Sequence, residues 1–400
     1  MKILFVSDVS IQDVIGGAER VLHEQARRLA DNGHTVQVMT RQTPFHEKEV
    51  EVVDGVHEWR YPFNPESAAS LYQTIRRGEV LFHKLWDRYH YDCINFHQPF
   101  TALSVIFSKT TNQARKIYTC HSLSFEEYAS RNPQPLESSR RLKRFLNLSI
   151  RRFLEKAVLD KCERIVVLSQ YTNEKLKRIH HIQPRKIAII PGGVDLKRFH
   201  PIKNRGFIKR QFGLPDKGVL LFTVRNLVPR MGLETLIRAM HQALKKTRDL
   251  YLVIGGEGTL EKPLKSLCRQ LGLQEHIRFS GFIPEDQLPA YYGAADLFVL
   301  PTRELEGFGL VTLEAMACAT PVIGTPIGGT REILEAFDPT CLFNGVSADG
   351  ISEVIVDKVK QLRSDSERWR EMTIRCRRFV EDRYSWDKNI KMTERILSGG

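Results

Sequence analysis

The sequence predicts an α/β protein made of two doubly wound domains in tandem. Short apolar runs alternate with amphipathic stretches along most of the 400 residues, which is typical of parallel strands joined by helices. The alternation stops at a polar, basic stretch, residues 191–210, and then restarts, which indicates a domain boundary. The length agrees with two domains, because one domain commonly holds roughly 100–200 residues.

The N-terminal domain is expected to span residues 1–190. Its apolar runs are short enough for buried strands, and its longer stretches, with apolar residues every three or four positions, suit helices. The strands are expected at 3–6, 35–40, 91–96, 116–120, 164–168 and 186–190, and the two clearest helices at 18–32 and 138–161.

The C-terminal domain is expected to span residues 191–384. Several of its expected strands end at glycines, among them Gly255, Gly256, Gly258 and Gly281. Ligands of open α/β sheets bind outside the carboxyl ends of the strands, so we expect the site at that edge. The strands are expected at 219–224, 250–254, 277–279, 297–300 and 320–323, and the helices at 233–244, 260–271 and 310–317.

The composition excludes several classes of protein. With 42% hydrophobic and 27% charged residues, the chain suits a soluble globular protein rather than a disordered or fibrous one. No run of about 18 apolar residues suggests a membrane-spanning helix, and the first apolar run stops at Asp8, too early for a signal peptide. Seven irregularly spaced cysteines without a Cys-x-x-Cys pair indicate reduced thiols rather than disulfides or a zinc site. We therefore expect a cytoplasmic protein.

Basic residues exceed acidic ones by 13, and the surplus is concentrated. Residues 109–161 hold 12 Lys and Arg against 5 Asp and Glu, a net charge of +7. From Arg140 to Ala157, basic residues interleave with apolar ones at helical spacing. We expect the apolar face of this helix to pack on the sheet; the alternative is that the amphipathic helix lies on anionic lipid. Its basic face would allow weak peripheral contact with the inner face of an anionic membrane.

The most informative segment is PTRELEGFGLVTLEAMACATPVIGTPIGGT, residues 301–330. Glu306 falls in the loop after an expected strand, and Glu314 falls in the helix that follows. Gly307 and Gly309 let the backbone approach a ligand at the start of that helix, where free N–H groups favour anions. Two carboxylates beside an anion cradle suit a ligand with both hydroxyl and phosphate groups. Two acids at this spacing alone would more often be solvated, so the surrounding residues carry the interpretation.

This segment resembles the retaining nucleotide-sugar glycosyltransferases of family GT4, which have the GT-B fold. The resemblance extends to GGAER at 16–20, IPGGVD at 190–195, FSGF at 279–282 and YSW at 384–386. It implies two Rossmann-like, doubly wound domains facing across a cleft, with the C-terminal helix, residues 385–400, returning to the first domain. It also implies donor binding by the C-terminal domain and acceptor binding by the N-terminal one.

The resemblance assigns roles by position. Glu306 would contact hydroxyls of the donor sugar, and Glu314 would hold the ribose hydroxyls. Arg225 would neutralise the diphosphate, and Gly16, beside Gly17, would close on the phosphates. The other donor-binding positions are the backbone of Phe308, Gly309 and Leu310 around the sugar and phosphates, and Gly281 and Phe282 beside the base.

A leaving diphosphate needs positive charge, which a divalent metal or fixed cations can supply. The sequence contains no Asp-x-Asp motif, so we expect fixed cations and no metal site. Many members of the family carry a lysine where this chain has Met231, and a thioether cannot neutralise a phosphate. We hypothesise that the adjacent Arg230 supplies this charge, because its planar guanidinium matches phosphate geometry.

Three further residues are candidates. His121 follows the strand 116–120, and the resemblance places it near the donor sugar as a hydrogen-bond donor; the alternative is a structural histidine at a strand end. His97 follows the strand 91–96 and suits either the acceptor or core packing. Arg20 begins a helix and either reaches a ligand or stays in solvent. No covalent nucleophile or general base is assigned.

The sequence is interpreted as a retaining hexosyltransferase that moves a sugar from a nucleotide diphosphate sugar to an acceptor hydroxyl without a cofactor. A UDP-sugar is the favoured donor and a GDP-sugar the alternative; the acceptor is a sugar, a lipid-linked molecule or a small molecule in polysaccharide or glycolipid synthesis. One rival is an epimerase or phosphorylase of the same fold, although no segment suggests a phosphorylase's lysine-bound pyridoxal. The other is a nucleic-acid-binding protein, suggested by the charge. It is not favoured, because the Phe residues of the basic helix have core-like spacing.

Overall fold

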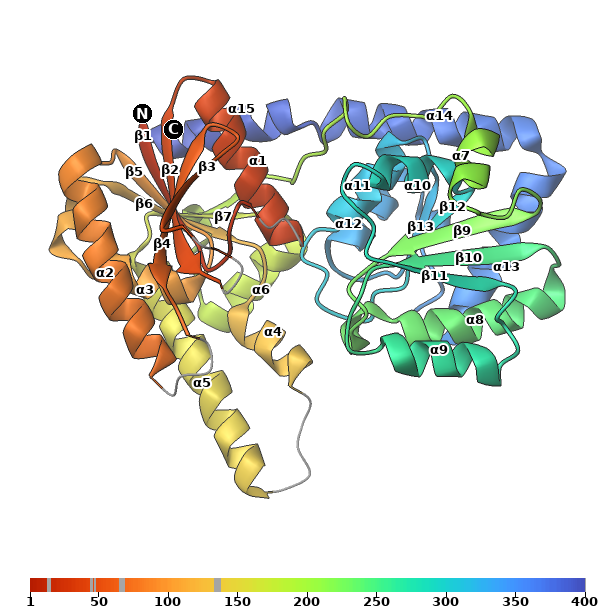
Figure 1. Cartoon of the computed structure of the whole chain (residues 1–400), viewed down its shortest axis with the longest axis horizontal. Helices are drawn as coiled ribbons and strands as arrows, with labels where there is room; N and C mark the ends of the chain where they lie inside the picture. Colours follow the sequence, from red (N-terminus) through yellow and green to blue (C-terminus); the bar gives the residue numbers. More distant parts are fainter. Residues whose placement is uncertain (13–15, 44–45, 47, 65–68, 133–137, 400) are drawn as a thin grey trace. The chain divides into compact units, whose positions relative to one another are not determined.

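The computed structural model describes residues 1–12, 16–43, 46, 48–64, 69–132 and 138–399. The chain divides into two compact units, Met1–Gly192 with Trp386–Gly400, and Gly193–Ser385. The boundaries expected from the sequence lie after residues 190 and 384. Each unit is built on one sheet with helices packed on its faces (Figure 1).

The sheet of the N-terminal unit has eight strands in the order β3-β4-β2-β1-β5-β6-β7-β8. Every neighbouring pair is parallel except β3 and β4, which are antiparallel. The strands are β1 (Lys2–Val6), β2 (Thr35–Gln42), β3 (Val50–Val53), β4 (Val56–Pro62), β5 (Cys93–Phe96), β6 (Arg115–Cys120), β7 (Arg164–Val167) and β8 (Ile187–Ile189). Six of them agree with the predicted strands to within two residues.

The β3–β4 hairpin was not predicted, because charged residues interrupt its apolar pattern. Glu58 and Arg60 lie in β4 and are 0% and 2% exposed. Arg60 Nε donates to Glu58 Oε1 at 2.6 Å, and the same carboxylate accepts from Ser10 Oγ at 2.7 Å and from the backbone N–H of Ile11 at 2.6 Å. The buried pair therefore fixes the start of the loop that leads to Gly16.

The helices of the N-terminal unit pack against its sheet and form two hydrophobic cores with it. One core contains Phe82, Phe96 and Tyr118, and the other contains Phe5 and Ile390. The C-terminal helix belongs to this unit and packs on its first helix, where Gln25 Nε2 donates to Asn389 Oδ1 at 3.1 Å. The helices are α1 (Gly17–Asp31), α2 (Ser70–Tyr89), α3 (Pro99–Ile106), α4 (Ser124–Arg131), α5 (Ser138–Lys161), α6 (Gln170–His180) and α15 (Trp386–Ser398), with short 3-10 turns at Lys109–Gln113 and Pro184–Lys186.

The sheet of the C-terminal unit has five parallel strands in the order β11-β10-β9-β12-β13. They are β9 (Val219–Val224), β10 (Leu250–Gly255), β11 (Ile277–Gly281), β12 (Leu297–Leu300) and β13 (Val322–Gly324). The helices are α7 (Arg205–Gln211), α8 (Leu233–Lys246), α9 (Glu261–Gln270), α10 (Leu288–Ala294), α11 (Leu310–Ala317), α12 (Gly328–Phe337), α13 (Ala348–Ser364) and α14 (Ser366–Arg383), with 3-10 turns at Pro229–Met231 and Pro339–Cys341. Strand order steps outward from β9 in both directions, so the loops after β9 and β12 leave the sheet side by side.

The expectation that the apolar face of α5 packs on the sheet is wrong for most of the helix. Its last turns pack inward, where Val158 and Leu159 are fully buried. The N-terminal half of α5, drawn in yellow, extends beyond the sheet of its own unit (Figure 1). The exposed apolar side chains are Leu142, Phe145, Leu146, Ile150 and Phe153, at 50% exposure for Leu146 and up to 72% for Phe153.

Candidate functional site

The loop between β12 and α11 is held in one conformation by close backbone contacts. Leu305 has a φ of +60° and Gly309 a φ of +92°, so the loop turns twice through the left-handed region, on either side of Glu306. Gly328, at the start of α12, has a φ of +59°, and a Cβ there would lie 1.9 Å from the carbonyl oxygen of Glu306. The N–H of Gly329 donates to that same oxygen at 3.1 Å. The backbone at Glu306 thus packs directly against the first residues of α12.

Arg225 and Glu306 meet at the carboxyl ends of β9 and β12. Arg225 Nη2 donates to Glu306 Oε2 at 2.5 Å, and the hydroxyl of Thr302 lies 3.0 Å from both groups. Their side chains are 7% and 11% exposed, so the pair is shielded from water and its hydrogen bond is charge-assisted. Arg225 Nε is buried and has no hydrogen-bond partner among the described residues. One N–H of this guanidinium is therefore unsatisfied among the described residues.

Met231 and Arg230 lie beside this pair. Met231 is buried, and its Sδ lies 3.0 Å from Arg225 Nη2, so the thioether packs directly against the guanidinium. Arg230 is half-buried, and its Nη1 donates to the carbonyl oxygen of Leu305 at 3.1 Å. Arg225, Arg230 and Glu306 thus gather around one loop. The sequence had suggested this grouping, but not the direct contact between Arg225 and Glu306.

Gly309 is the N-cap of α11 and lies between two threonine hydroxyls. A Cβ on Gly309 would lie 2.5 Å from Thr330 Oγ1 and 3.3 Å from Thr312 Oγ1. Both hydroxyls are buried and have no hydrogen-bond partner among the described residues. Two unpaired hydroxyls and the free N–H groups of a helix start form a cradle that suits phosphate or sugar oxygens. Thr312 and Thr330 were not singled out from the sequence, although both lie in the 301–330 segment.

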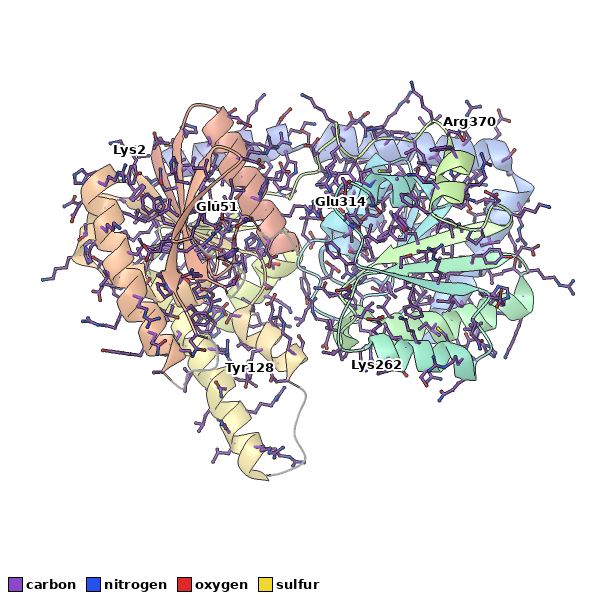
Figure 2. The ribbon with its side chains drawn as sticks, viewed as in Figure 1. Lys2, Glu51, Tyr128, Lys262, Glu314 and Arg370 are labelled. Carbon is purple, nitrogen blue, oxygen red and sulfur yellow. The ribbon has the colours of Figure 1, made fainter. Side chains whose placement is uncertain are left out.

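Glu314 lies inside the C-terminal unit, on α11. It is 2% exposed, and the hydroxyl of Tyr292 donates to its Oε2 at 2.8 Å. Figure 2 labels Glu314 on α11. Tyr292 stacks edge-on against Phe222 and Phe298 at ring distances of 5.4 and 5.2 Å, so the core fixes the group that orients the carboxylate.

The remaining predicted positions of the C-terminal unit divide into packed and exposed ones. Phe308 is buried, and its ring lies 6.1 Å from that of Tyr384, so only its backbone is open to a ligand role. Leu310 is also buried. Gly281 ends β11 with a φ of +65°, and the next residue, Phe282, is 60% exposed. An exposed aromatic ring at this strand end can stack on a base.

Gly16, Gly17 and His121 belong to the N-terminal unit. Gly16 is the N-cap of α1, and a Cβ there would lie 2.8 Å from Glu19 Oε2, so the carboxylate of Glu19 folds back toward the helix start. Burial raises the pKa of Glu19. Gly17 is the first residue of α1, and Arg20 lies in its first turn. Residues 13–15 of the same loop are outside the described residues.

His97 and His121 form a pair at the ends of β5 and β6, in which His97 is buried and His121 is half-buried. His97 Nδ1 lies 2.9 Å from His121 Nε2, with ring centroids 5.1 Å apart. Burial, followed by the charge of His121, holds the pKa of His97 well below its usual range, and burial lowers the pKa of His121 to about 4. Both rings are therefore neutral near pH 7, and one donates its N–H to the other. The sequence had treated the two histidines as separate candidates.

Two family comparisons together cover most of the chain. The family described as "Glycosyltransferase Family 4" matches residues 15–198, and "Glycosyl transferases group 1" matches residues 204–379. The chain belongs to glycosyltransferase family 4. This confirms the resemblance stated from the 301–330 segment.

Relatives of this family 4 glycosyltransferase include two curated bacterial proteins. The "GDP-mannose-dependent alpha-(1-6)-phosphatidylinositol monomannoside mannosyltransferase" of Mycolicibacterium smegmatis is 33% identical over 217 residues, 52% of this chain. That match spans 56% of the relative's own length. The "D-inositol 3-phosphate glycosyltransferase" of Salinispora tropica is 28% identical over 402 residues, covering 94% of this chain and 79% of the relative.

Solved structures confirm the GT-B fold of this family 4 glycosyltransferase. The sucrose-phosphate synthase of Thermosynechococcus elongatus has a TM-score of 0.83 at 22% identity, covering 100% of this chain and 98% of that one. HepE of Anabaena, solved in complex with UDP-glucose, has a TM-score of 0.74 at 18% identity and covers both chains completely. Every helix in the part of this chain that the structure describes falls short of the length or the apolar character that a bilayer span requires. The same described residues hold no group of three or more His, Cys, Asp or Glu side chains placed to bind a metal.

Proposed function

We propose that this chain transfers a sugar from a nucleoside diphosphate sugar to an acceptor hydroxyl, with retention of the anomeric configuration and without a metal ion. The observation that carries the proposal is the buried contact of Arg225 with Glu306 beside the α11 cradle at Gly309. A cation, a carboxylate and an anion-binding helix start in one place match the parts of the donor: diphosphate, sugar hydroxyls and the developing charge between them.

In this proposal the C-terminal unit binds the donor. Arg225, through its unpaired Nε, and Arg230 neutralise the diphosphate, while Gly309 and the Thr312 and Thr330 hydroxyls contact its oxygens. Glu306 accepts from a sugar hydroxyl. The other donor contacts are the ribose at Glu314, the base beside Gly281 and Phe282, and the backbone of Phe308 and Leu310 along the sugar.

The N-terminal unit contributes the acceptor side and two donor contacts in this proposal. Gly16 and Gly17 offer backbone N–H groups at the α1 start to the phosphates. His121 donates to the donor sugar. His97 is its support: with its Nδ1 against His121 Nε2, it decides which ring nitrogen of His121 carries the proton.

The leaving group is stabilised by fixed cations rather than by a metal. When the sugar–phosphate bond breaks, negative charge grows on the diphosphate, and cations held in place beforehand lower that barrier without rearranging. We propose front-face attack, in which the leaving phosphate takes the proton from the acceptor hydroxyl. Within this scheme Glu306 positions the sugar and forms no covalent bond.

The donor base and the acceptor class are also part of the proposal. A UDP-sugar is favoured from the sequence, the name of HepE's complex contains UDP-glucose, and the name of the M. smegmatis relative contains GDP-mannose. The acceptor is a hydroxyl on a sugar, a lipid-linked molecule or a small molecule, as the relatives' names also suggest. All seven cysteines are free and buried, which supports work in the reducing cytoplasm.

The test is a donor panel without and with acceptors. A UDP- or GDP-sugar at about 100 times its dissociation constant should stabilise the chain by about 2.7 kcal/mol, which thermal melts resolve. Transfer should then require an acceptor, and proton NMR of the product should show the donor's anomeric configuration. Conversion of the donor sugar without an acceptor would identify an epimerase instead. Salt-sensitive binding of oligonucleotides, with no response to any donor, would favour the nucleic-acid alternative.

A further inference from the structure

The first four turns of α5 carry an apolar stripe on their outer side. Leu142, Leu146, Ile150 and Phe153 recur every three or four residues and therefore line one side of the helix. They are 61%, 50%, 52% and 72% exposed, and Phe145 beside them is 64% exposed. Single exposed apolar residues are ordinary, but a contiguous stripe marks a contact surface.

The opposite side of α5 is fastened to its own unit. Glu155 is 0% exposed; its carboxylate accepts from the backbone N–H of Ser124 at 2.8 Å and lies 3.0 Å from His180 Nε2. The guanidinium of Arg151 lies 4.3 Å from the ring centre of Tyr128, and Figure 2 labels Tyr128 on neighbouring α4. These contacts fix the rotation of the helix, so the stripe cannot turn inward.

Two of the exposed cations of α5, Lys143 and Arg152, border the stripe. Residues 138–154 contain six Arg and Lys and no Asp or Glu. Three of the six also bind within the unit: Arg151 lies on Tyr128, Arg144 donates to the carbonyl oxygens of Asn132 and Ala129, and Arg152 Nη2 donates to the carbonyl oxygen of Ile179 at 2.7 Å. At about 100° per residue, Lys143 and Arg152 lie on opposite sides of the stripe. The exposed cations are Arg140, Arg141, Lys143 and Arg152.

We propose that this surface, which we name the α5 docking surface (Leu142, Lys143, Phe145, Leu146, Ile150, Arg152 and Phe153), binds the chain peripherally to an anionic lipid bilayer. The apolar side chains would enter the boundary between head groups and acyl chains, and the bordering cations would meet lipid phosphates. Charge decides the occupant. A second copy would bring the same cations face to face, and a nucleic acid would leave the aliphatic stripe without a partner.

The proposal is tested with the full chain and vesicles alone. Sedimentation compares phosphatidylcholine vesicles with vesicles that also contain about 30% phosphatidylglycerol, at about 0.1 M salt, where the Debye length is about 10 Å. The chain should partition onto the anionic vesicles at least about tenfold more strongly, since several cations contribute. Salt at about 1 M should weaken this binding. Neither donor nor acceptor is present, so a negative result would leave the proposed transferase activity untouched.

Two pairs of variants separate the apolar and the charged contributions. Leu146→Ser with Phe153→Ser should lower partitioning by about tenfold or more, because both side chains lose burial in the bilayer. Its control is Phe207→Ser with Ile374→Ser, two exposed apolar residues of the C-terminal unit. Lys143→Glu should lower partitioning by about tenfold or more, because a cation beside the stripe becomes an anion. Its control makes the same charge change on α14, at the exposed Arg370.

The results that overturn the proposal are distinct from one another. The proposal is refuted if the wild-type chain does not bind anionic vesicles. It is also refuted if the α5 variants and their controls lose vesicle binding to the same extent. Sedimentation equilibrium showing a dimer that Leu146→Ser with Phe153→Ser dissociates, in a chain that ignores vesicles, would assign the surface to a second copy. Circular dichroism and melting temperature check the fold of each variant, and Phe153→Ser alone replaces the double variant if that one unfolds.

Discussion

Arg225 Nη2 lies 2.5 Å from Glu306 Oε2, although 81 residues separate the two in the sequence. The sequence assigned them different partners, a diphosphate and a sugar hydroxyl. In the structure each is the other's partner, and the Thr302 hydroxyl joins them. A phosphate that reaches Arg225 would therefore share the positive charge of the guanidinium with the carboxylate of Glu306. The pair also fixes both side chains in advance, which is the condition for strong electrostatic stabilisation.

This relationship predicts opposite effects of removing charge from the two acids. Glu306→Gln should abolish most turnover, yet nucleoside diphosphate should bind at least as tightly, because Arg225 no longer shares its charge with a carboxylate. Glu314→Gln should weaken the same nucleotide by about 1.5–3 kcal/mol, the value of a hydrogen bond to a charged group. Calorimetry with UDP and GDP separates the two variants. Equal weakening in both would contradict the assignment.

Arg230 is predicted to act as the second cation of the site. It lies beside the Glu306 loop and bonds the carbonyl oxygen of Leu305, while Met231 occupies the usual lysine position and packs on Arg225. Arg230→Ala should lower kcat/KM by about 10²–10³-fold, comparable to Arg225→Ala, as when one preorganised donor is removed. Arg230→Lys should recover only part, because the planar fork is lost. Near-normal kcat/KM in Arg230→Ala would leave Arg225 as the single arginine of the site.

The close packing of the Glu306 backbone on α12 predicts that Gly328→Ala strongly lowers the free energy of unfolding. Its Cβ would lie 1.9 Å from the carbonyl oxygen of Glu306, so the loop must move in addition to the left-handed strain. Gly345→Ala is the matched control, because Gly345 also has a positive φ, +90°, but nothing lies within 4 Å of its Cβ. The control should cost about 1–2 kcal/mol of unfolding free energy, and Gly328→Ala clearly more, with loss of donor binding. Urea unfolding measures the loss of stability in both variants. Equal losses would argue against close packing of the Glu306 backbone on α12.

The pair of His97 and His121 predicts a loss of stability in mild acid. The folded-state pKa of His121 is lowered to about 4 from the usual 6.5, and that of His97 is lowered too. As pH falls from 6.5 toward 4, the unfolded chain takes up protons that the folded chain cannot. Stability should therefore be full above pH 6.5 and fall by up to about 3 kcal/mol for His121 by pH 4.

Replacing both histidines checks this expectation. His97→Gln with His121→Gln should flatten the dependence of unfolding free energy on pH between 6.5 and 4. His57→Gln, at an exposed position of β4, is the control and should keep the wild-type slope. An unchanged slope in the double variant would show that other groups dominate acid unfolding.

Transfer is predicted to continue in excess EDTA. The reason lies in the sequence, which has no Asp-x-Asp motif, and in Arg225 and Arg230, which lie together beside the Glu306 loop. The initial rate with the best donor should be the same with EDTA as with Mg²⁺ or Mn²⁺. Complete loss in EDTA, restored by either metal, would contradict metal-free transfer.

The sequence was enough to locate eleven of the thirteen strands in the described residues and to indicate the family. A short apolar run predicts a buried strand because the pattern that marks it is local in the sequence. The family can be recognised in the same way, because the 301–330 segment is a continuous motif. The β3–β4 hairpin escaped prediction because Glu58 and Arg60 are buried as a pair, and a pattern of polar residues does not reveal pairing across space.

Tertiary structure decided which distant side chains touch and which face solvent. The contact of Arg225 with Glu306, the threonine hydroxyls around Gly309 and the pairing of His97 with His121 all join separate segments, so no spacing along the chain encodes them. The direction of the α5 stripe was decided in the same way. An amphipathic sequence gives a helix an apolar and a polar face. Which face turns outward is determined by the contact of the buried Glu155 with Ser124 and of Arg151 with Tyr128.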